Sequence, residues 1–278
     1  MTNNGYKMLF SREFKDYLSL AEECGQTYVG HGNPNASILI VANEPGVVND
    51  DFIKYDLEKN LEKWKADLSV RSMDNVDVMF DGNHNLVWEK FNPLWPYKGQ
   101  CLTQIRTTID SEGKTIILNK DKHPTSRSWI QYQKLVNLIY GKSKEVKGLP
   151  VDYFKYAFIA DFSAVYGKHS NEISRDDRLD SITRRLPLFA SDFITHFPII
   201  IVASGHYIHD FKPLNDLTKV FQGFDKVERV KDSLGWRNIH LSSDGKRILI
   251  HSKHFASAIS DNYLEKIASA CAPFLNDN

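Results

Sequence analysis

Residues 37–46 read SILIVANEPG, and this stretch decides how the chain is expected to fold. Its first six residues form an uninterrupted apolar run rich in β-branched side chains, the pattern of a strand buried on both faces of a parallel sheet. A loop follows at once, made of Asn43, Glu44, Pro45 and Gly46. Because active sites of open parallel sheets collect at the carboxyl ends of strands, the stretch predicts a strand and a candidate site together.

Three further apolar runs resemble this strand, at 156–160, 199–203 and 247–250. Apolar residues at helical spacing lie between the runs, and serines stand where N-caps are expected. The predicted helices cover residues 10–24, 57–68, 126–141, 174–193 and the segment after Ser260. Strands that alternate with helices in this way predict a doubly wound α/β domain.

Two turn signals add detail to this prediction. Asp244-Gly245 stands between 238–241 and 247–251 and predicts a hairpin, and a second hairpin is expected around residues 111–113. Pro187 predicts a kink in the helix that contains it. We expect residues 1–278 to form one domain around a central, mostly parallel four-stranded sheet, with an insertion at about 47–125.

The composition limits the classes of protein to which the chain can belong. Of its 278 residues 42% are hydrophobic, enough for a packed core. Thirty-five basic residues balance thirty-five acidic ones, and this neutrality disfavours a protein that binds DNA tightly through its phosphates alone. The three cysteines show no CxxC spacing, which indicates reduced thiols. The start lacks a signal-peptide pattern and no apolar run reaches the ~20 residues of a membrane span, so we expect a cytoplasmic protein, with a monomer favoured.

Three stretches resemble the uracil-DNA glycosylase superfamily. Residues 30–46, GHGNPNASILIVANEPG, are similar to its first motif, with a Gly-rich approach, an NPxA step, an apolar strand and an ending such as GEAPG or GQDPY. Residues 199–205, IIIVASG, are similar to its later IIVALG strand and turn, and residues 247–256, RILIHSKHFA, stand where its HPSP motif lies. The resemblance implies a three-layer α/β/α sandwich and hydrolysis of the N-glycosidic bond of uracil or a modified base in DNA.

The resemblance also implies catalytic roles. Glu44 precedes the proline, where some branches keep an Asp or Asn that orients or activates water, and Asn43 falls where the iron–sulfur branch keeps its Glu. His251 falls on the histidine that hydrogen-bonds the uracil carbonyl as the base departs. Breaking the bond builds positive charge on the sugar and negative charge on the base, which a carboxylate and an imidazole would stabilise.

Substrate contacts are implied at further positions. Tyr97, in the stretch PYKG, is similar to an aromatic of a PFxG segment that stacks on the base, although Trp95 or Phe162 could serve instead. An Asn that reads the uracil edge is common where this chain has Asp161, and an ionised Asp161 lacks the donor–acceptor pair of an amide. The remaining expected substrate contacts are Pro45, Gly46, Phe162, Ser163, Lys253 and His254.

Other features bear on cofactors and on charge. Four cluster cysteines are missing, so no iron–sulfur centre is expected. The pairs His206-x-x-His209 and His251-x-x-His254 lack a matching acidic or cysteine partner, so no metal or other cofactor is expected. The basic residues from Arg175 to Arg185 alternate with acids, which favours a solvated helix face.

Two alternatives to the enzyme remain open. A catalytically inactive member of the same fold would bind a nucleotide, nucleic acid or protein partner, and the zero net charge, Asp161 and the change from Pro-Ser to Ser252-Lys253 favour it. The third hypothesis is a small-molecule hydrolase that uses the same crevice. DNA is the partner that the glycosylase hypothesis requires.

Overall fold

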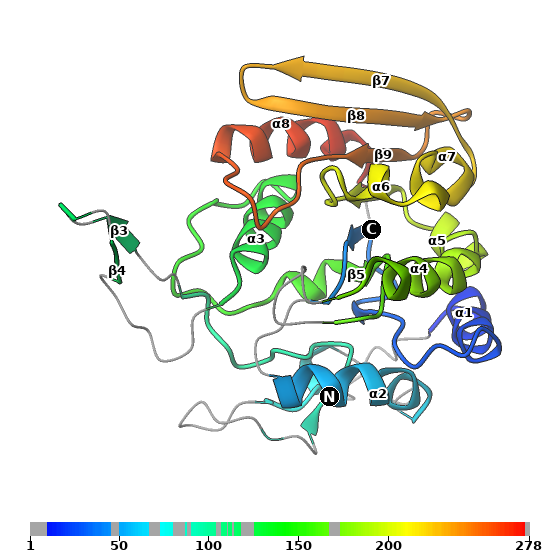
Figure 1. Ribbon diagram of the computed structural model, residues 1–278. Helices are drawn as coiled ribbons and strands as arrows, with labels where there is room; N and C mark the ends of the chain where they lie inside the picture. The colour runs from blue at the N-terminus through cyan, green and yellow to red at the C-terminus, as the bar shows by residue number, and fades with distance from the viewer. Residues whose placement is uncertain are drawn as a thin grey trace, which may run out of the picture.

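The computed structural model describes residues 10–45, 50–66, 73–79, 87, 90–103, 107–109, 111–112, 114–117, 125–166 and 173–275. They form an α/β structure around a mixed seven-stranded sheet with the strand order β1-β5-β2-β6-β9-β8-β7 (Figure 1). In that order the strands are His31–Gly32, Ala157–Asp161, Ile38–Ala42, Ile199–Val202, Ile248–His251, Gly235–Ser242 and Phe224–Asp232. A separate pair joins β3 (Thr107–Ile109) to β4 (Thr115–Ile117).

The centre of the sheet contains the four strands expected from the sequence. β2 pairs in parallel with β5 and β6, and β6 pairs in parallel with β9. Side chains from Ile38 to Val41 and from Ile199 to Val202 have no exposed surface. Strands buried on both faces need apolar residues at every position, which is why these runs do not alternate.

Within the described part of the chain the sheet nevertheless has seven strands where four were expected. β1 pairs antiparallel with β5, and β8 pairs antiparallel with both β9 and β7. The β8–β9 hairpin confirms the Asp244-Gly245 turn, where Gly245 has a φ of +69°. The sequence of β7, FDKVERVKD, gave no apolar signal because an edge strand protects itself from further pairing with charged side chains.

Helices begin close to where the serine caps place them. α1 (Arg12–Glu23), α3 (Arg127–Ile139), α4 (Arg175–Phe189) and α8 (Asp261–Cys271) each start directly after a serine whose hydroxyl accepts a backbone N–H. The remaining helices are α2 (Asp50–Ala66), α5 (Asp192–Thr195), α6 (Tyr207–Asp210) and α7 (Leu217–Val220), and short 3₁₀ turns cover Met73–Asn75, Tyr153–Lys155, Lys212–Leu214 and Ala272–Phe274. The predicted helix 174–193 is two helices: α4 ends two residues after Pro187, which removes a backbone donor from its last turn.

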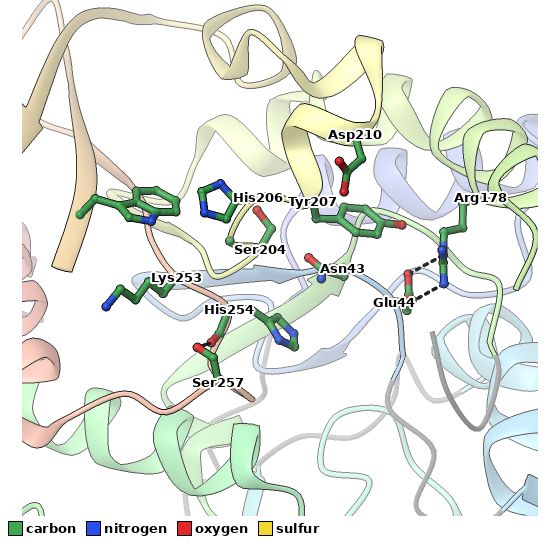
Figure 2. Close-up of a pocket in the computed structure, with 12 residues that line it drawn as sticks. Asn43, Glu44, Arg178, Ser204, His206, Tyr207, Asp210, Lys253, His254 and Ser257 are labelled. Atoms are coloured by element: carbon green, nitrogen blue, oxygen red, sulfur yellow. Dashed lines mark hydrogen bonds and ion pairs between the residues drawn. The ribbon is translucent and has the colours of Figure 1, made fainter. Parts of the chain in front are cut away.

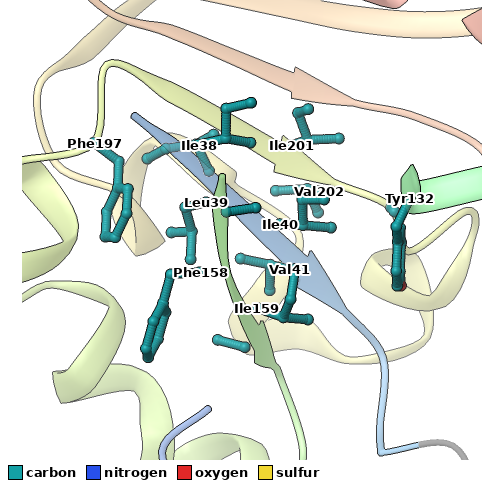
Figure 3. Packing of buried hydrophobic residues seen from close by; sticks show 14 of the residues in the cluster. Ile38, Leu39, Ile40, Val41, Tyr132, Phe158, Ile159, Phe197, Ile201 and Val202 are labelled. Atoms are coloured by element: carbon teal, nitrogen blue, oxygen red, sulfur yellow. The ribbon is translucent and has the colours of Figure 1, made fainter. Parts of the chain in front are cut away.

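Aromatic side chains join the helices to the sheet. On β5, Phe158 contacts Phe14 of α1 and Phe193 of α5, with ring centroids 6.0 and 5.3 Å apart. Tyr132 of α3 contacts Phe255, which follows β9, at 5.6 Å, and Figure 3 shows Phe158 and Tyr132 on opposite sides of the central strands. The predicted hairpin around residues 111–113 is confirmed by the β3–β4 pairing, while Gly113 itself lies outside the described residues. Among the helices described, none combines the length and apolarity needed to cross a membrane.

Candidate functional site

The carboxyl ends of three adjacent parallel strands meet at one cavity. Asn43 and Glu44 follow β2, Ser204 follows β6, and His254 belongs to the loop after β9. The cavity has a volume of about 530 Å³, within the range of ligand sites (Figure 2). Its described lining consists of Asn43, Glu44, Arg178, Ser204, Gly205, His206, Tyr207, Asp210, Trp236, Lys253, His254 and Ser257.

Glu44 is held in the cavity by an arginine from α4. Arg178 Nη2 lies 3.3 Å from Glu44 Oε1, and Arg178 Nε lies 3.3 Å from Glu44 Oε2. The two side chains are only 14% and 10% exposed. The Nη2–Oε1 contact is a charge-assisted hydrogen bond, whereas the Nε–Oε2 contact is an ion pair without hydrogen-bond geometry. Together they hold the Glu44 carboxylate against the guanidinium. The Ser174 cap sets where α4 begins and so aims Arg178 at the end of β2.

The stretch from Arg175 to Arg185 is therefore not a solvated face throughout, as its alternating charges suggested. Arg178 faces the cavity, and Arg185 has no exposed surface. Arg185 Nε donates to the backbone carbonyl of Asp161 at 3.1 Å, and Nη1 donates to Gln26 Oε1 at 3.3 Å. Carbonyl groups from two other segments thus solvate this buried cation, which a helical charge pattern does not reveal.

Tyr207 lies beside Glu44 at the same end of the cavity. Burial, and then the negative charge of Glu44, raises the pKa of the Tyr207 hydroxyl well above its usual range. Tyr207 therefore keeps its proton and offers an O–H donor near the carboxylate. It comes from α6, directly after the Ser204-Gly205 turn that ends β6.

His251, the histidine singled out by the sequence, does not line the cavity. It has no exposed surface and its Nε2 lies 2.8 Å from the carbonyl oxygen of Gly205. Because a carbonyl only accepts, Nε2 carries the proton, and Nδ1 is left to accept from Asn238 Nδ2 at 3.4 Å. Burial lowers the pKa of His251 to about 4, so the ring is neutral at neutral pH. Its single N–H donates to the Gly205 carbonyl and is therefore not available to a ligand.

His254, three residues later, is the imidazole that faces Glu44. It is partly buried and lines the cavity, as Figure 2 shows. Burial lowers the pKa of His254, and the negative charge of Glu44 opposes this lowering. The cavity thus contains the carboxylate and imidazole expected from the sequence, with His254 in the place given to His251. Lys253, also expected, lines the cavity beside it.

The other expected substrate contacts are placed elsewhere. Tyr97 is 5% exposed and packs on Trp129, with ring centroids 4.0 Å apart. Phe162 is fully buried against Phe189 at 5.2 Å. Ser163 is also fully buried. None of these lines the cavity, and neither does Pro45, while Gly46 lies outside the described residues.

Asp161 belongs to a buried polar network next to the cavity. Tyr28 donates its hydroxyl to Asp161 Oδ2 at 2.6 Å, and burial raises the pKa of Asp161 to about 6. Nearby, His31 Nε2 lies 2.7 Å from Asp56 Oδ2, again with both side chains buried. Asp161, expected from the sequence as a substrate contact, is thus engaged within the protein and does not line the cavity. Among the described residues, no group of three His, Cys, Asp or Glu side chains could hold a metal ion.

Ser204 and Asn43 bring further polar atoms to the cavity. Ser204 Oγ and Asn43 Oδ1 are buried and form no hydrogen bond with the part of the chain that the structure describes. Buried polar groups in native proteins are almost always paired with protein, water or ligand. These two atoms, from the ends of β6 and β2, can therefore hydrogen-bond a molecule in the cavity. Asn43 was expected at the site from the sequence, and Ser204 was not.

Comparison with known proteins leaves the family open. No model of a protein family matches the chain, and no curated protein matches it either.

Proposed function

We propose that the chain is a DNA glycosylase-like hydrolase of the uracil-DNA glycosylase superfamily, which cleaves the N-glycosidic bond of uracil or a modified base. The parallel strands β5, β2, β6 and β9 support this assignment, because they fit the four-stranded sheet that the motifs imply. We regard the helices on the two sides of these strands as the outer layers of a three-layer sandwich. β1, β8 and β7 then extend the sheet, and residues 47–125 are an insertion within one domain.

The observation that carries the proposal is the placement of Glu44 and His254 in one cavity. In hydrolysis, a water oxygen forms a bond to C1′ of the sugar while the C1′–N bond to the base breaks. Glu44 accepts a proton from that water, and His254 donates its N–H to the departing base. Each carboxylate oxygen has lone pairs beyond the one that Arg178 occupies, so Glu44 can still orient water.

Asn43, Ser204 and Tyr207 supply the remaining polar contacts. The unpaired atoms of Asn43 and Ser204 would hydrogen-bond the base or the sugar, and the Tyr207 hydroxyl would donate near the attacking water. Preorganised donors of this kind contribute roughly 3–4 kcal/mol each when they act on charge that develops in the transition state. In this proposal DNA is the partner, and no cofactor takes part.

A second candidate function rests on the Glu44–Arg178 pair. Arg178 contacts both oxygens of Glu44 and so neutralises the charge that should stabilise a sugar cation. This favours a non-catalytic protein of the same fold that binds a nucleotide, nucleic acid or protein partner in the cavity. Such a protein would bind oligonucleotides and release no base.

Base release tests the proposal. The protein is incubated with oligonucleotides that each contain one uracil, hypoxanthine or xanthine, and abasic sites are scored by alkaline cleavage. We expect release from at least one substrate and a loss of about a hundredfold or more in Glu44→Gln. Glu58→Gln changes an exposed carboxylate that is not part of the cavity lining; it is the matched control and should retain full activity. No release from any substrate, or full activity in Glu44→Gln, contradicts the proposal.

A further inference from the structure

The cavity has a second end, away from the Glu44–Arg178 pair. Figure 2 shows Lys253 and His206 opposite Glu44 and Arg178. Trp236, from the start of β8, lines the cavity together with them. Its ring centroid lies 5.4 Å from that of His206, which places it at the same end. The cavity has a volume of about 530 Å³ and extends in this direction, so it has room for more than a single reacting base.

Trp236 is partly buried and is held by contacts of both its backbone and its ring. Its backbone carbonyl accepts a hydrogen bond from the Tyr263 hydroxyl at 2.7 Å. The indole stands against His251 at a centroid distance of 4.8 Å and an interplanar angle of 64°. His251 is itself fixed by Gly205, so the contact also stabilises the indole. A preoriented aromatic ring loses little conformational freedom when a ligand stacks on it.

Lys253 adds positive charge beside this ring. Its Nζ donates to the Leu234 carbonyl at 3.1 Å and lies 5.3 Å from the centre of the Tyr263 ring. An ammonium has three N–H donors, so the contact with Leu234 leaves others for a ligand. Gly235 has a φ of +139°, and a Cβ there would collide with the Lys253 side chain. The positive φ of Gly235 is what favours glycine at the tip of the β7–β8 hairpin, and the Lys253 side chain packs against this residue.

The aromatic residues expected to stack on a base cannot serve at this end. Tyr97 and Trp95 are 5% and 6% exposed and line no part of the cavity. The Trp95 N–H is used by the Val151 carbonyl, at 2.7 Å. Among the described lining residues Trp236 has the largest ring, and it belongs to a hairpin that the motifs do not include.

We infer that this end is a second nucleotide subsite, in which the base next to the reacting nucleotide stacks on Trp236 and the linking phosphate contacts Lys253. The inference rests on the proposed function for the place of the reacting base, between Glu44 and His254. A neighbouring base inside a duplex is already stacked and paired and cannot turn onto an indole. The substrate class is therefore single-stranded or locally unpaired DNA. Stacking of one base on an aromatic side chain changes the dissociation constant by about 5- to 150-fold.

Binding by spacer-containing oligonucleotides tests the subsite. Single-stranded oligonucleotides carry one central uracil, and a tetrahydrofuran spacer replaces each neighbouring nucleotide in turn. Dissociation constants are measured by fluorescence anisotropy at fixed salt with the Glu44→Gln protein, so that any release of uracil does not interfere. We expect one spacer position to weaken binding by about 5- to 150-fold. We also expect the unsubstituted single strand to bind more tightly than its duplex.

The same series in variants assigns the effect to the indole. In Trp236→Leu the critical spacer should change affinity by less than about twofold, because the stacking partner has gone. Trp236→Phe keeps a ring and should show an intermediate effect. This more conservative variant keeps the test usable if the Trp236→Leu protein fails to fold. Tyr166→Leu removes an aromatic that is 38% exposed and does not line this cavity, and should behave as the parent protein.

Three results would overturn the subsite: no binding of the oligonucleotides, equal affinity at every spacer position, or a spacer effect that persists in Trp236→Leu. The outcome separates the two proposals. If the wild-type protein releases uracil but the spacer effect does not depend on Trp236, the subsite is wrong and the proposed function stands. If the spacer effect depends on Trp236 but no base is released, the enzymatic function is wrong and the subsite stands.

Discussion

Arg178 contacts both carboxylate oxygens of Glu44: Nη2 lies 3.3 Å from Oε1, and Nε lies 3.3 Å from Oε2. The two residues are 134 positions apart in the chain. One follows the central strand β2, and the other belongs to the second turn of α4. This ion pair lies at one end of the cavity and holds the Glu44 carboxylate there.

Replacing Arg178 with lysine should separate charge from geometry. Lysine keeps the positive charge but cannot span both oxygens, so Glu44 should no longer be held at both of them. We expect base release to fall about tenfold or more in Arg178→Lys. The free energy of unfolding should fall by about 1–3 kcal/mol in Arg178→Gln, which leaves a largely buried carboxylate unpaired. Urea denaturation and the release assay measure the two effects. Arg184→Lys, in an exposed pair with Asp180 on the same helix, should change neither. Equal effects at Arg178 and Arg184 would contradict the role given to the pair.

Replacing His254 should lower base release with little effect on stability, whereas His251 has a structural role. In His254→Gln the cavity keeps its shape but loses the imidazole N–H, so base release should fall by about a hundredfold. The free energy of unfolding should change by less than about 1 kcal/mol, because His254 is only partly buried. Full activity in His254→Gln, together with a stable but inactive His251→Gln, would return the donor role to His251.

The stability of the protein should depend on pH through His251. Burial lowers its pKa to about 4, below the unfolded value of about 6.5. Between these values the unfolded chain binds the extra proton, so this contribution to stability is complete above pH 6.5 and is lost as the pH falls to 4. The loss amounts to about 3 kcal/mol. Urea denaturation at pH 7 and pH 4 should show that His251→Asn lacks this component of the pH dependence. Parallel pH curves for both proteins would contradict the neutral buried ring.

Asp161 should act in the opposite direction. Burial raises its pKa to about 6, above its unfolded value of about 3.9, so the folded protein binds the proton more tightly and stability falls as the pH rises through this window. Asp161→Asn keeps an oxygen to accept from Tyr28 and removes the charge. We expect the variant to be more stable than wild type by about 1–3 kcal/mol at pH 8 and nearly equal at pH 4. A less stable variant at pH 8 would show that Arg185 requires the Asp161 charge.

Much of the fold follows from short-range patterns. The four parallel strands were predictable because a strand buried on both faces must be apolar at every position, as from Ile38 to Val41. The starts of α1, α3, α4 and α8 were predictable because an N-cap is a local hydrogen bond, as between Ser174 and the N–H of Asp177. α2 begins at Asp50, earlier than the expected residue 57, and no serine directly precedes it. β7 was not, because an edge strand rich in charge has no periodic apolar signal.

The site shows the same division. The sequence alone determined that Asn43 and Glu44 end a buried strand and that a histidine follows another, since strand, turn and loop are encoded by neighbouring residues. Only the tertiary structure decided that His254 rather than His251 faces the cavity, and that Arg178, Ser204 and Trp236 join it. The two histidines are three positions apart. The N–H of His251 donates to the carbonyl of Gly205, whereas His254 lines the cavity. Such choices depend on contacts between segments far apart in the chain, and local periodicity carries no information about those contacts.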